Sequence, residues 1–141
     1  MTEVITLDAV DGSGVRLPVK LEVPTGPPCV IYLVRDGYER REVRAEDLFE
    51  AMIGVRKILE EEGLLLCAQG AMPDVFPSGM ARQMGDGRFA YRLRHGESGN
   101  SGDEMVDIFA PAAMGEVVTI SEQRDAVLRF YKSIRFKPRS L

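Results

Sequence analysis

The chain has 141 residues, of which 45% are hydrophobic and 28% charged, and its formal net charge is −4. This length suits one domain with a hydrophobic core of its own, and the composition is ordinary for a soluble globular protein. The acidic balance disfavours a protein that holds nucleic acid by neutralising its phosphates. The longest apolar runs, Cys29–Val34 and Leu64–Ala68, fall far short of the roughly 18 residues that cross a bilayer.

The compartment is predicted from the start of the chain and from its cysteines. The acidic opening Met1-Thr2-Glu3 leads directly into a strand pattern and does not have the form of a signal peptide. Cys29 and Cys67 each lie inside an apolar run, which favours buried free thiols over a disulfide. We therefore expect a cytoplasmic protein without a membrane or nucleic-acid partner.

A hairpin is predicted at the start of the chain. Val4–Ala9 is the first strand, and Asp11–Gly14 is a turn rich in residues that tolerate a positive φ. Val15–Val23 then alternates apolar and polar residues at period two, which is typical of a half-buried strand. Because Pro18 lacks the N–H that a ladder needs, we expect this second strand to lie at a sheet edge or to carry a bulge.

Two more strands are predicted before the first helix. Cys29–Arg35 is a continuous apolar run, typical of a strand that is covered on both faces. Asp36-Gly37 follows, and Asp-Gly between strands is a strong hairpin signal. The return strand, Tyr38–Arg44, is rich in Arg and Glu, which is how an exposed edge strand avoids pairing with other chains.

A helix is predicted over Glu46–Glu62, because apolar residues recur there at spacings of three and four. Glu46 and Asp47 suit its positive N-terminal end, and Gly63 suits the position after its C-terminus. The acidic run Glu60–Glu62 lies at the end where the helix dipole disfavours it, and no interaction along the sequence accounts for it beyond solubility.

The middle of the chain is predicted to be a buried strand, Leu64–Ala68, a loop, Gln69–Ser78, and a short helix, Gly79–Met84. A strand over Arg88–His95 follows, with one apolar and one mostly basic face. Gly96–Asp103 is a Gly-rich loop.

The last third predicts a second long helix. Met105–Phe109 and Glu116–Ile120 are expected to be short strands or extended connections. Thr119 and Glu122 have the spacing of a capping box, which starts a helix that runs to about Ser133. Strands, a helix, more strands and a closing helix indicate the α+β class. We expect a single domain, 1–141, with an antiparallel or mixed sheet of about five to seven strands and both main helices on one face.

An anion site is the first candidate for chemistry. Ser78 precedes the short helix, whose N-terminus presents free N–H groups, Arg82 lies one turn further on, and Arg88 opens the next strand. A carboxylate or phosphate fits such a set. The alternative, which we favour because caps are far commoner than anion sites, is that Ser78 only caps the helix and the arginines pair with Asp74 and Asp86.

A nucleophilic site is the second candidate, with Cys67 or Ser78 beside His95, the one histidine of the chain. Cys67 lies in the run LLLCA, where a thiol is buried and inert. Ser78 lacks the Gly-x-Ser-x-Gly elbow, and an exposed histidine before Gly96 needs no catalytic explanation. One His and two distant Cys do not make a structural zinc site, so no metal or cofactor is expected.

A binding surface is the third candidate, because the loop and short helix are unusually apolar. Its residues are Met72, Val75, Phe76, Met80 and Met84. Met-rich surfaces adapt to partners. The alternative, which we favour for most of them, is that they fill the end of the core and anchor the loop.

The run CAQGAMPDVFPSGMARQMGDGRFAY, with YLVRDGYERREV upstream and DIFAP downstream, resembles a family of small uncharacterised bacterial proteins. The resemblance covers most of the chain from Tyr32 onward and implies a real structural unit, but it brings no activity with it. Small acidic α+β proteins of this kind also resemble some immunity proteins encoded beside bacterial toxins.

We therefore predict a non-enzymatic cytoplasmic binding module whose contact region is Gln69–Arg88 and whose partner is a protein, a second copy included. One alternative is a small-anion or nucleotide-binding protein, or an enzyme, that uses the same loop. Another is a structural subunit of a homo-oligomer that pairs through Tyr38–Arg44 or a helix face. The predicted binding residues are Phe76, Ser78, Met80, Arg82, Arg88 and His95.

Overall fold

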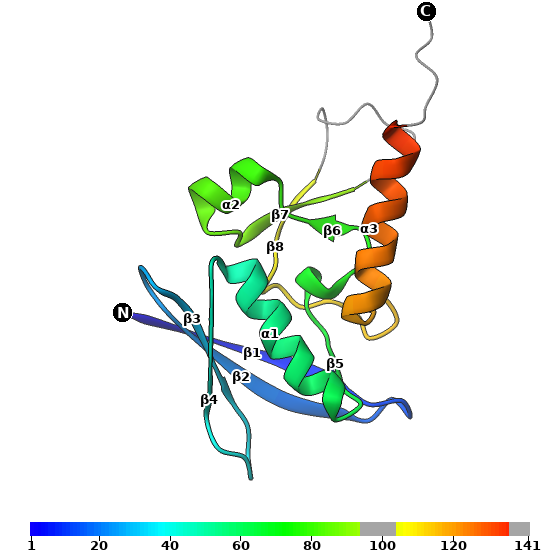
Figure 1. Cartoon of the computed structure of the whole chain (residues 1–141). Coiled ribbons are helices and arrows are strands. Elements are labelled where there is room, and N and C mark those ends of the chain that lie inside the picture. Colours follow the sequence, from blue (N-terminus) through cyan, green and yellow to red (C-terminus); the bar gives the residue numbers. More distant parts are fainter. Residues whose placement is uncertain (94–103, 136–141) are drawn as a thin grey trace, which may run out of the picture.

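The computed structural model describes residues 1–93 and 104–135 and divides its strands between two sheets (Figure 1). The larger sheet has five strands and the smaller has three. The elements in chain order are β1 (Thr2–Val10), β2 (Arg16–Pro24), β3 (Cys29–Val34), β4 (Arg41–Ala45), α1 (Leu48–Glu61), β5 (Leu65–Leu66), the 3-10 helix η1 (Gln69–Ala71), β6 (Val75–Phe76), α2 (Gly79–Gly85), β7 (Phe89–Arg92), β8 (Met105–Asp107) and α3 (Ile120–Arg135).

The five-stranded sheet is antiparallel throughout, with the order β4-β3-β2-β1-β5. Helix α1 lies across one face of it (Figure 1). The alternate apolar residues of the strands face the helix, as the period-two pattern predicts. The buried residues of this layer are Leu7, Ala9, Val19, Leu21, Val23, Ile31 and Leu33 from the sheet and Phe49, Met52, Val55 and Leu59 from α1.

Pro18 does not place its strand at a sheet edge, because β2 lies between β1 and β3. The ladder between β2 and β3 covers only Lys20–Glu22, so Pro18 lies where β2 has no neighbour on the β3 side. A missing N–H at that position removes no ladder bond. The proline therefore lies at a local edge within a central strand. The prediction that this strand lies at the edge of the sheet is wrong.

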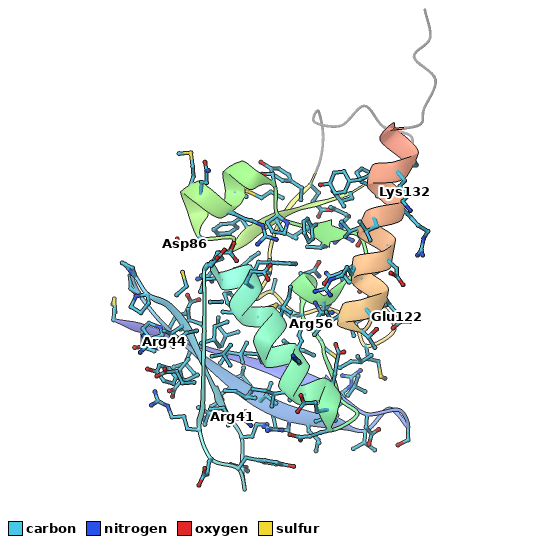
Figure 2. The ribbon with its side chains drawn as sticks, in the orientation of Figure 1. Arg41, Arg44, Arg56, Asp86, Glu122 and Lys132 are labelled. Atoms are coloured by element: carbon cyan, nitrogen blue, oxygen red, sulfur yellow. The ribbon has the colours of Figure 1, made fainter. Side chains whose placement is uncertain are left out.

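The strand that follows Asp36-Gly37 is an edge strand, as predicted, since β4 pairs only with β3. Leu33 pairs with Arg41, so the connection is longer than a two-residue hairpin turn. Gly37 has a φ of +80°, which a glycine adopts without strain. Figure 2 shows Arg41 and Arg44 along this outer strand, where both are exposed.

Helix α1 begins as predicted at its acidic end. The Oδ1 atom of Asp47 accepts a hydrogen bond from the N–H of Glu50 at 2.8 Å, which satisfies one of the free N–H groups of the first turn. Gly63, with a φ of +78°, follows the C-terminus in the left-handed conformation that a C′ glycine supplies.

The acidic C-terminal run of α1 has two structural partners that no local pattern reveals. Both terminal guanidinium nitrogens of Arg35 donate to the carboxylate of Glu62, at 2.7 and 3.0 Å. Glu60 accepts a hydrogen bond from the N–H of Ile120, the first residue of α3, at 2.9 Å. The run therefore ties α1 to the end of β3 and to the start of α3, which outweighs its unfavourable place on the helix dipole.

We expect Glu62 to contribute to the pH dependence of stability. The hydrogen bond from Arg35 lowers the pKa of Glu62 below its ordinary value of 4.5. The contribution is therefore complete above about pH 4.5 and is lost as the pH falls through the lowered pKa of the folded state. When the pH is lowered from neutral to about 3, the free energy of unfolding should therefore fall less in Glu62→Gln than in the wild type. Urea denaturation at both pH values measures this difference.

The control for this prediction is Glu61→Gln, because the neighbouring Glu61 forms no ion pair among the described residues. Its acid destabilisation should match that of the wild type. Equal acid destabilisation in Glu62→Gln and Glu61→Gln would contradict the assignment of the effect to the Arg35 pair.

The predicted loop 69–78 contains η1 and β6, and β6 belongs to the second sheet, which has the order β6-β7-β8. The predicted strand 64–68 is reduced to the two residues of β5. The end of the predicted strand Arg88–His95 and the loop Gly96–Asp103 lie outside the described residues. Of the two segments expected near the last helix, Met105–Phe109 is strand β8 over Met105–Asp107, and Glu116–Ile120 is a connection that ends where α3 begins at Ile120.

Helix α3 begins with the predicted capping box. The Oγ1 atom of Thr119 accepts from the N–H of Glu122 at 3.1 Å, and the carboxylate of Glu122 accepts from the N–H of Thr119 at 3.0 Å. The helix contacts α1 and lies beside β6 (Figure 1). The α+β class and the two main helices are thus confirmed. Among the described residues, no helix combines the length and apolar character that crossing a membrane requires.

Candidate functional site

Ser78 is the N-cap of α2. Its Oγ atom accepts a hydrogen bond from the N–H of Ala81 at 3.0 Å. The helix has only seven residues, and Asp86 ends it in a left-handed conformation with a φ of +55°. The hydroxyl is therefore committed to the helix end, which is the alternative that the sequence favoured.

Arg82 binds the first turn of α1. One of its terminal nitrogens lies 2.9 Å from a carboxylate oxygen of Asp47 and 3.0 Å from one of Glu50. Its guanidinium carbon also lies 5.3 Å from the ring centre of Phe49 and 5.2 Å from that of Phe76. Arg82 thus joins α2 to α1 through charge and ring contacts, and its partners are not the predicted Asp74.

Arg88 binds different carboxylates. Its guanidinium donates to Glu3 of β1, at 2.5 and 3.0 Å, and to Asp107 of β8 at 3.1 Å. The hydrogen bonds to Glu3 and Asp107 raise the pKa of Arg88 and keep it charged. The predicted partner, Asp86, instead lies beside the start of α1, where its carbonyl oxygen accepts from the N–H of Leu48 (Figure 2).

The arginines of the loop do not share a partner, and each already has carboxylates around it. Asp74 pairs with Arg92, which also donates to Glu104 at 3.0 Å. An anion at this place has to displace existing carboxylates from Arg82 or Arg88. The geometry therefore favours ion pairing over anion binding, with partners that differ from the predicted ones.

The candidate nucleophilic site, which the sequence disfavoured, is not assembled among the described residues. Cys67 is buried, Cys29 is half-buried, and both thiols are free. Burial raises the pKa of each thiol, which disfavours the reactive thiolate. His95 lies outside the described residues. Residues 1–93 and 104–135 contain no group of three His, Cys, Asp or Glu side chains placed to hold a metal ion.

The apolar residues of the loop divide between the core and the surface. Met72 and Val75 are buried, as expected of residues that anchor the loop. Phe76 is half-buried and packs edge-on against Phe49, with ring centres 5.3 Å apart. Met84 is 81% exposed. Met80 belongs to α2, and its side chain lies outside the described part of the structure.

An apolar groove runs between α1, β6 and α3, with a volume of about 170 Å³. Glu50 and Arg124 lie at its sides, and Arg124 has no ion-pair partner in the described part of the chain. Leu128, which belongs to the groove, is 54% exposed, and the exposed Tyr131 follows one turn later on α3. The apolar lining residues are Phe49, Ile53, Phe76, Ile120, Val127 and Leu128.

The comparisons with known proteins do not assign a family. No protein-family model matches the chain, and the search of curated proteins found no match. The resemblance of the segment around Cys67 to small bacterial proteins therefore stays a prediction.

Two further hollows have similar sizes. One of about 200 Å³ lies between the turn after β2 and the turn after α2, and it contains Cys29, Asp86 and Arg88. Another of about 190 Å³ lies between Asp74 and Phe130. Pockets for small molecules commonly have about 300–1,000 Å³. All three hollows are below that range and suit a single inserted side chain better than a cofactor.

A buried polar cluster holds the wall of the groove, and the sequence reasoning missed it. Arg56 of α1 is 1% exposed and donates to the side-chain oxygen of Gln123 at 2.6 Å, to the carbonyl of Val118 at 3.0 Å and to that of Gly70 at 3.3 Å. Burial lowers the pKa of Arg56 to about 10. A sign was present in the sequence, because Arg56 follows Met52 by four residues and so falls within the apolar stripe of the helix.

Gln123 of α3 completes this cluster. Its side-chain nitrogen donates to the carbonyl oxygens of Gly70, Met72 and Val75, at 2.9, 2.8 and 3.1 Å. These carbonyls belong to the segment from η1 to β6, so one glutamine fixes that segment against α3. The Arg56–Gln123 cluster therefore sets the distance between the three elements that form the groove.

Proposed function

We propose that the chain is a non-enzymatic cytoplasmic module that binds another protein through the groove between α1, β6 and α3. The observation that carries this proposal is an apolar groove that continues onto the exposed residues Leu128 and Tyr131 of α3. An exposed apolar surface beside a groove is characteristic of protein-binding sites. The unbridged thiols Cys29 and Cys67 support the compartment.

The chemistry of the groove limits the partner. The apolar lining and the small volume suit one aliphatic or aromatic side chain inserted as an anchor. Arg124 stands at the side of the groove without an ion-pair partner among residues 1–93 and 104–135. The expected partner segment therefore carries a large apolar residue close to an Asp or Glu, and it lies along two helices as an extended or helical peptide.

The anion-binding alternative is less well supported, because both predicted arginines are neutralised by carboxylates within the chain. The proposed contact region also differs from the predicted one, Gln69–Arg88. The groove contains Phe76 of that segment, but most of the residues that line the groove come from α1 and α3.

The test is site-specific photocrosslinking in the cells that produce the protein. A photoreactive amino acid at the position of Leu128 is expected to give discrete adducts with another protein. The matched control places the same amino acid at Leu17, which is 46% exposed on β2, a strand that contributes no residue to the groove. Equal adducts from both positions, or none from position 128, would contradict the proposal.

A charge substitution gives the second readout. Leu128→Lys is expected to abolish the adducts formed from a photoreactive residue at Tyr131, because it places an ammonium group in an apolar contact. Leu17→Lys should leave them unchanged. Both side chains are exposed, so the melting temperatures of both variants should remain close to that of the wild type.

A further inference from the structure

The outer edge of β1 carries backbone groups with no partner among the described residues. In the ladder with β2, Pro18 and Pro24 lie opposite Asp8 and Thr2. Since proline has no N–H, these pairs are the ones without hydrogen bonds between β1 and β2. The even-numbered residues of β1 therefore direct their N–H and C=O groups away from β2.

Two further hydrogen bonds fix the same assignment. The N–H of Thr25 donates to the carbonyl of Met1 across the β1–β2 ladder at 2.9 Å, as expected of an odd-numbered position. On the other side, the N–H of Cys67 donates to the carbonyl of Asp8 at 2.8 Å. The pairing with β5 covers Ala9 and Val10 and goes no further toward the start of β1.

The free part of this edge is therefore Thr2 to Thr6. Beyond Cys67 the chain leaves β1, because Ala68 forms its bridge with Pro111 instead. Thr2, Val4 and Thr6 are exposed, and Val4 is 56% exposed. Each directs an N–H and a C=O toward a position that no strand among residues 1–93 and 104–135 occupies.

The two edges of the five-stranded sheet are built in opposite ways. One edge, β4, carries the exposed and charged Arg41, Glu42 and Arg44, which discourage pairing with another strand. Figure 2 shows Arg41 and Arg44 on this strand. The free residues of the other edge are two threonines and a valine, which are β-branched and uncharged and favour strand pairing. We propose that the free edge of β1 pairs with the same edge of a second copy of this chain, which joins two five-stranded sheets into one.

Self-complementarity is the reason to assign a second copy as the occupant. An antiparallel pairing centred on Val4 places Val4 opposite the second copy's Val4, and Thr2 opposite the second copy's Thr6. These are the three outward-facing residues before β5 begins, so each pair exchanges both of its hydrogen bonds. Glu3, held by Arg88, comes opposite the second copy's Ile5, and no like charges face each other.

The test is sedimentation equilibrium of the full chain over a wide range of concentrations, with three variants of β1. The wild type is expected to show a reversible equilibrium between monomer and dimer. Val4→Pro removes only an outward N–H, as Pro18 and Pro24 do on β2, and should raise the dissociation constant of the dimer about tenfold or more. Val4→Thr keeps the N–H and the β-branched shape and should dimerise as the wild type does.

Val4→Lys keeps the N–H but brings two ammonium groups together at the symmetry axis, so it should be monomeric. This variant decides the question if circular dichroism shows that Val4→Pro does not fold. Leu128→Lys should still dimerise, which separates this interface from the groove. A wild type that is monomeric at every concentration overturns the proposal, whether or not another protein's strand then binds β1. Dimers of Val4→Pro and Val4→Lys as stable as those of the wild type overturn it as well.

Discussion

Replacing Arg56 with alanine is expected to lower the free energy of unfolding by about 3 kcal/mol, the largest effect predicted for any single residue here. The carbonyl of Val118 and the side-chain oxygen of Gln123 lose a donor inside the protein, whereas Gly70 keeps the bond from Gln123. A cavity also replaces the side chain. The gain from no longer burying a charge, visible in the lowered pKa of Arg56, offsets part of the loss.

Urea denaturation of three variants tests this prediction. Lys57→Ala is the matched control, because Lys57 is the exposed neighbour on the same helix, and its effect should stay within about 0.5 kcal/mol. Arg56→Met fills most of the volume without supplying donors, so its loss should lie between those of the other two. An Arg56→Ala variant as stable as Lys57→Ala would show that the cluster does not hold α1, η1 and α3 together.

The second large effect is expected at Asp47, whose replacement by alanine should lower the free energy of unfolding by about 2–3 kcal/mol. The buried carboxylate of Asp47 caps α1 through the N–H of Glu50 and also binds Arg82 at 2.9 Å. The substitution removes the cap and one of the two carboxylates that neutralise Arg82. Helix α2 should loosen from α1 in consequence.

Thermal and urea denaturation of Asp47→Ala and Glu46→Ala provide the measurement. Glu46 is acidic and exposed and lies one residue before the cap, so its removal should change stability by no more than about 0.5 kcal/mol. Asp47→Asn keeps a cap acceptor but loses the charge and should fall between the two. Equal stability of the two alanine variants would mean that the Arg82 pair contributes nothing to the junction of α1 and α2.

Predictions that depend on neighbours in the chain agree with the structure. Ser78 caps α2, Thr119 and Glu122 form their capping box, and Gly63 ends α1 in the left-handed conformation. The physical reason is that a cap or a turn is decided by residues three or four positions apart. The alternation in Val15–Val23 likewise predicted that Val19, Leu21 and Val23 face the core, whereas Leu17, at the start of β2, is exposed.

Predictions that depend on distant partners were the ones that failed. Arg82 pairs with Asp47, which is 35 residues away, and Arg88 with Glu3, which is 85 residues away. The nearby Asp74 and Asp86 were the natural choice from spacing alone. The edge-strand prediction from Pro18 failed for a similar reason. The ladder between β2 and β3 stops before Pro18, so a proline fits in a central strand, and the length of that ladder cannot be read from the sequence of β2.

The sequence by itself determined the α+β class, the order of the main elements, their caps and the buried faces, since each follows from local periodicity and local hydrogen bonding. The tertiary structure alone decided where the loop arginines find their charges, how Arg56 and Gln123 are buried together, and where a groove and a free strand edge remain. Those features arise where segments far apart in the chain meet or fail to meet. Hydrophobic patterning says which face of an element is buried but does not say which other element covers it.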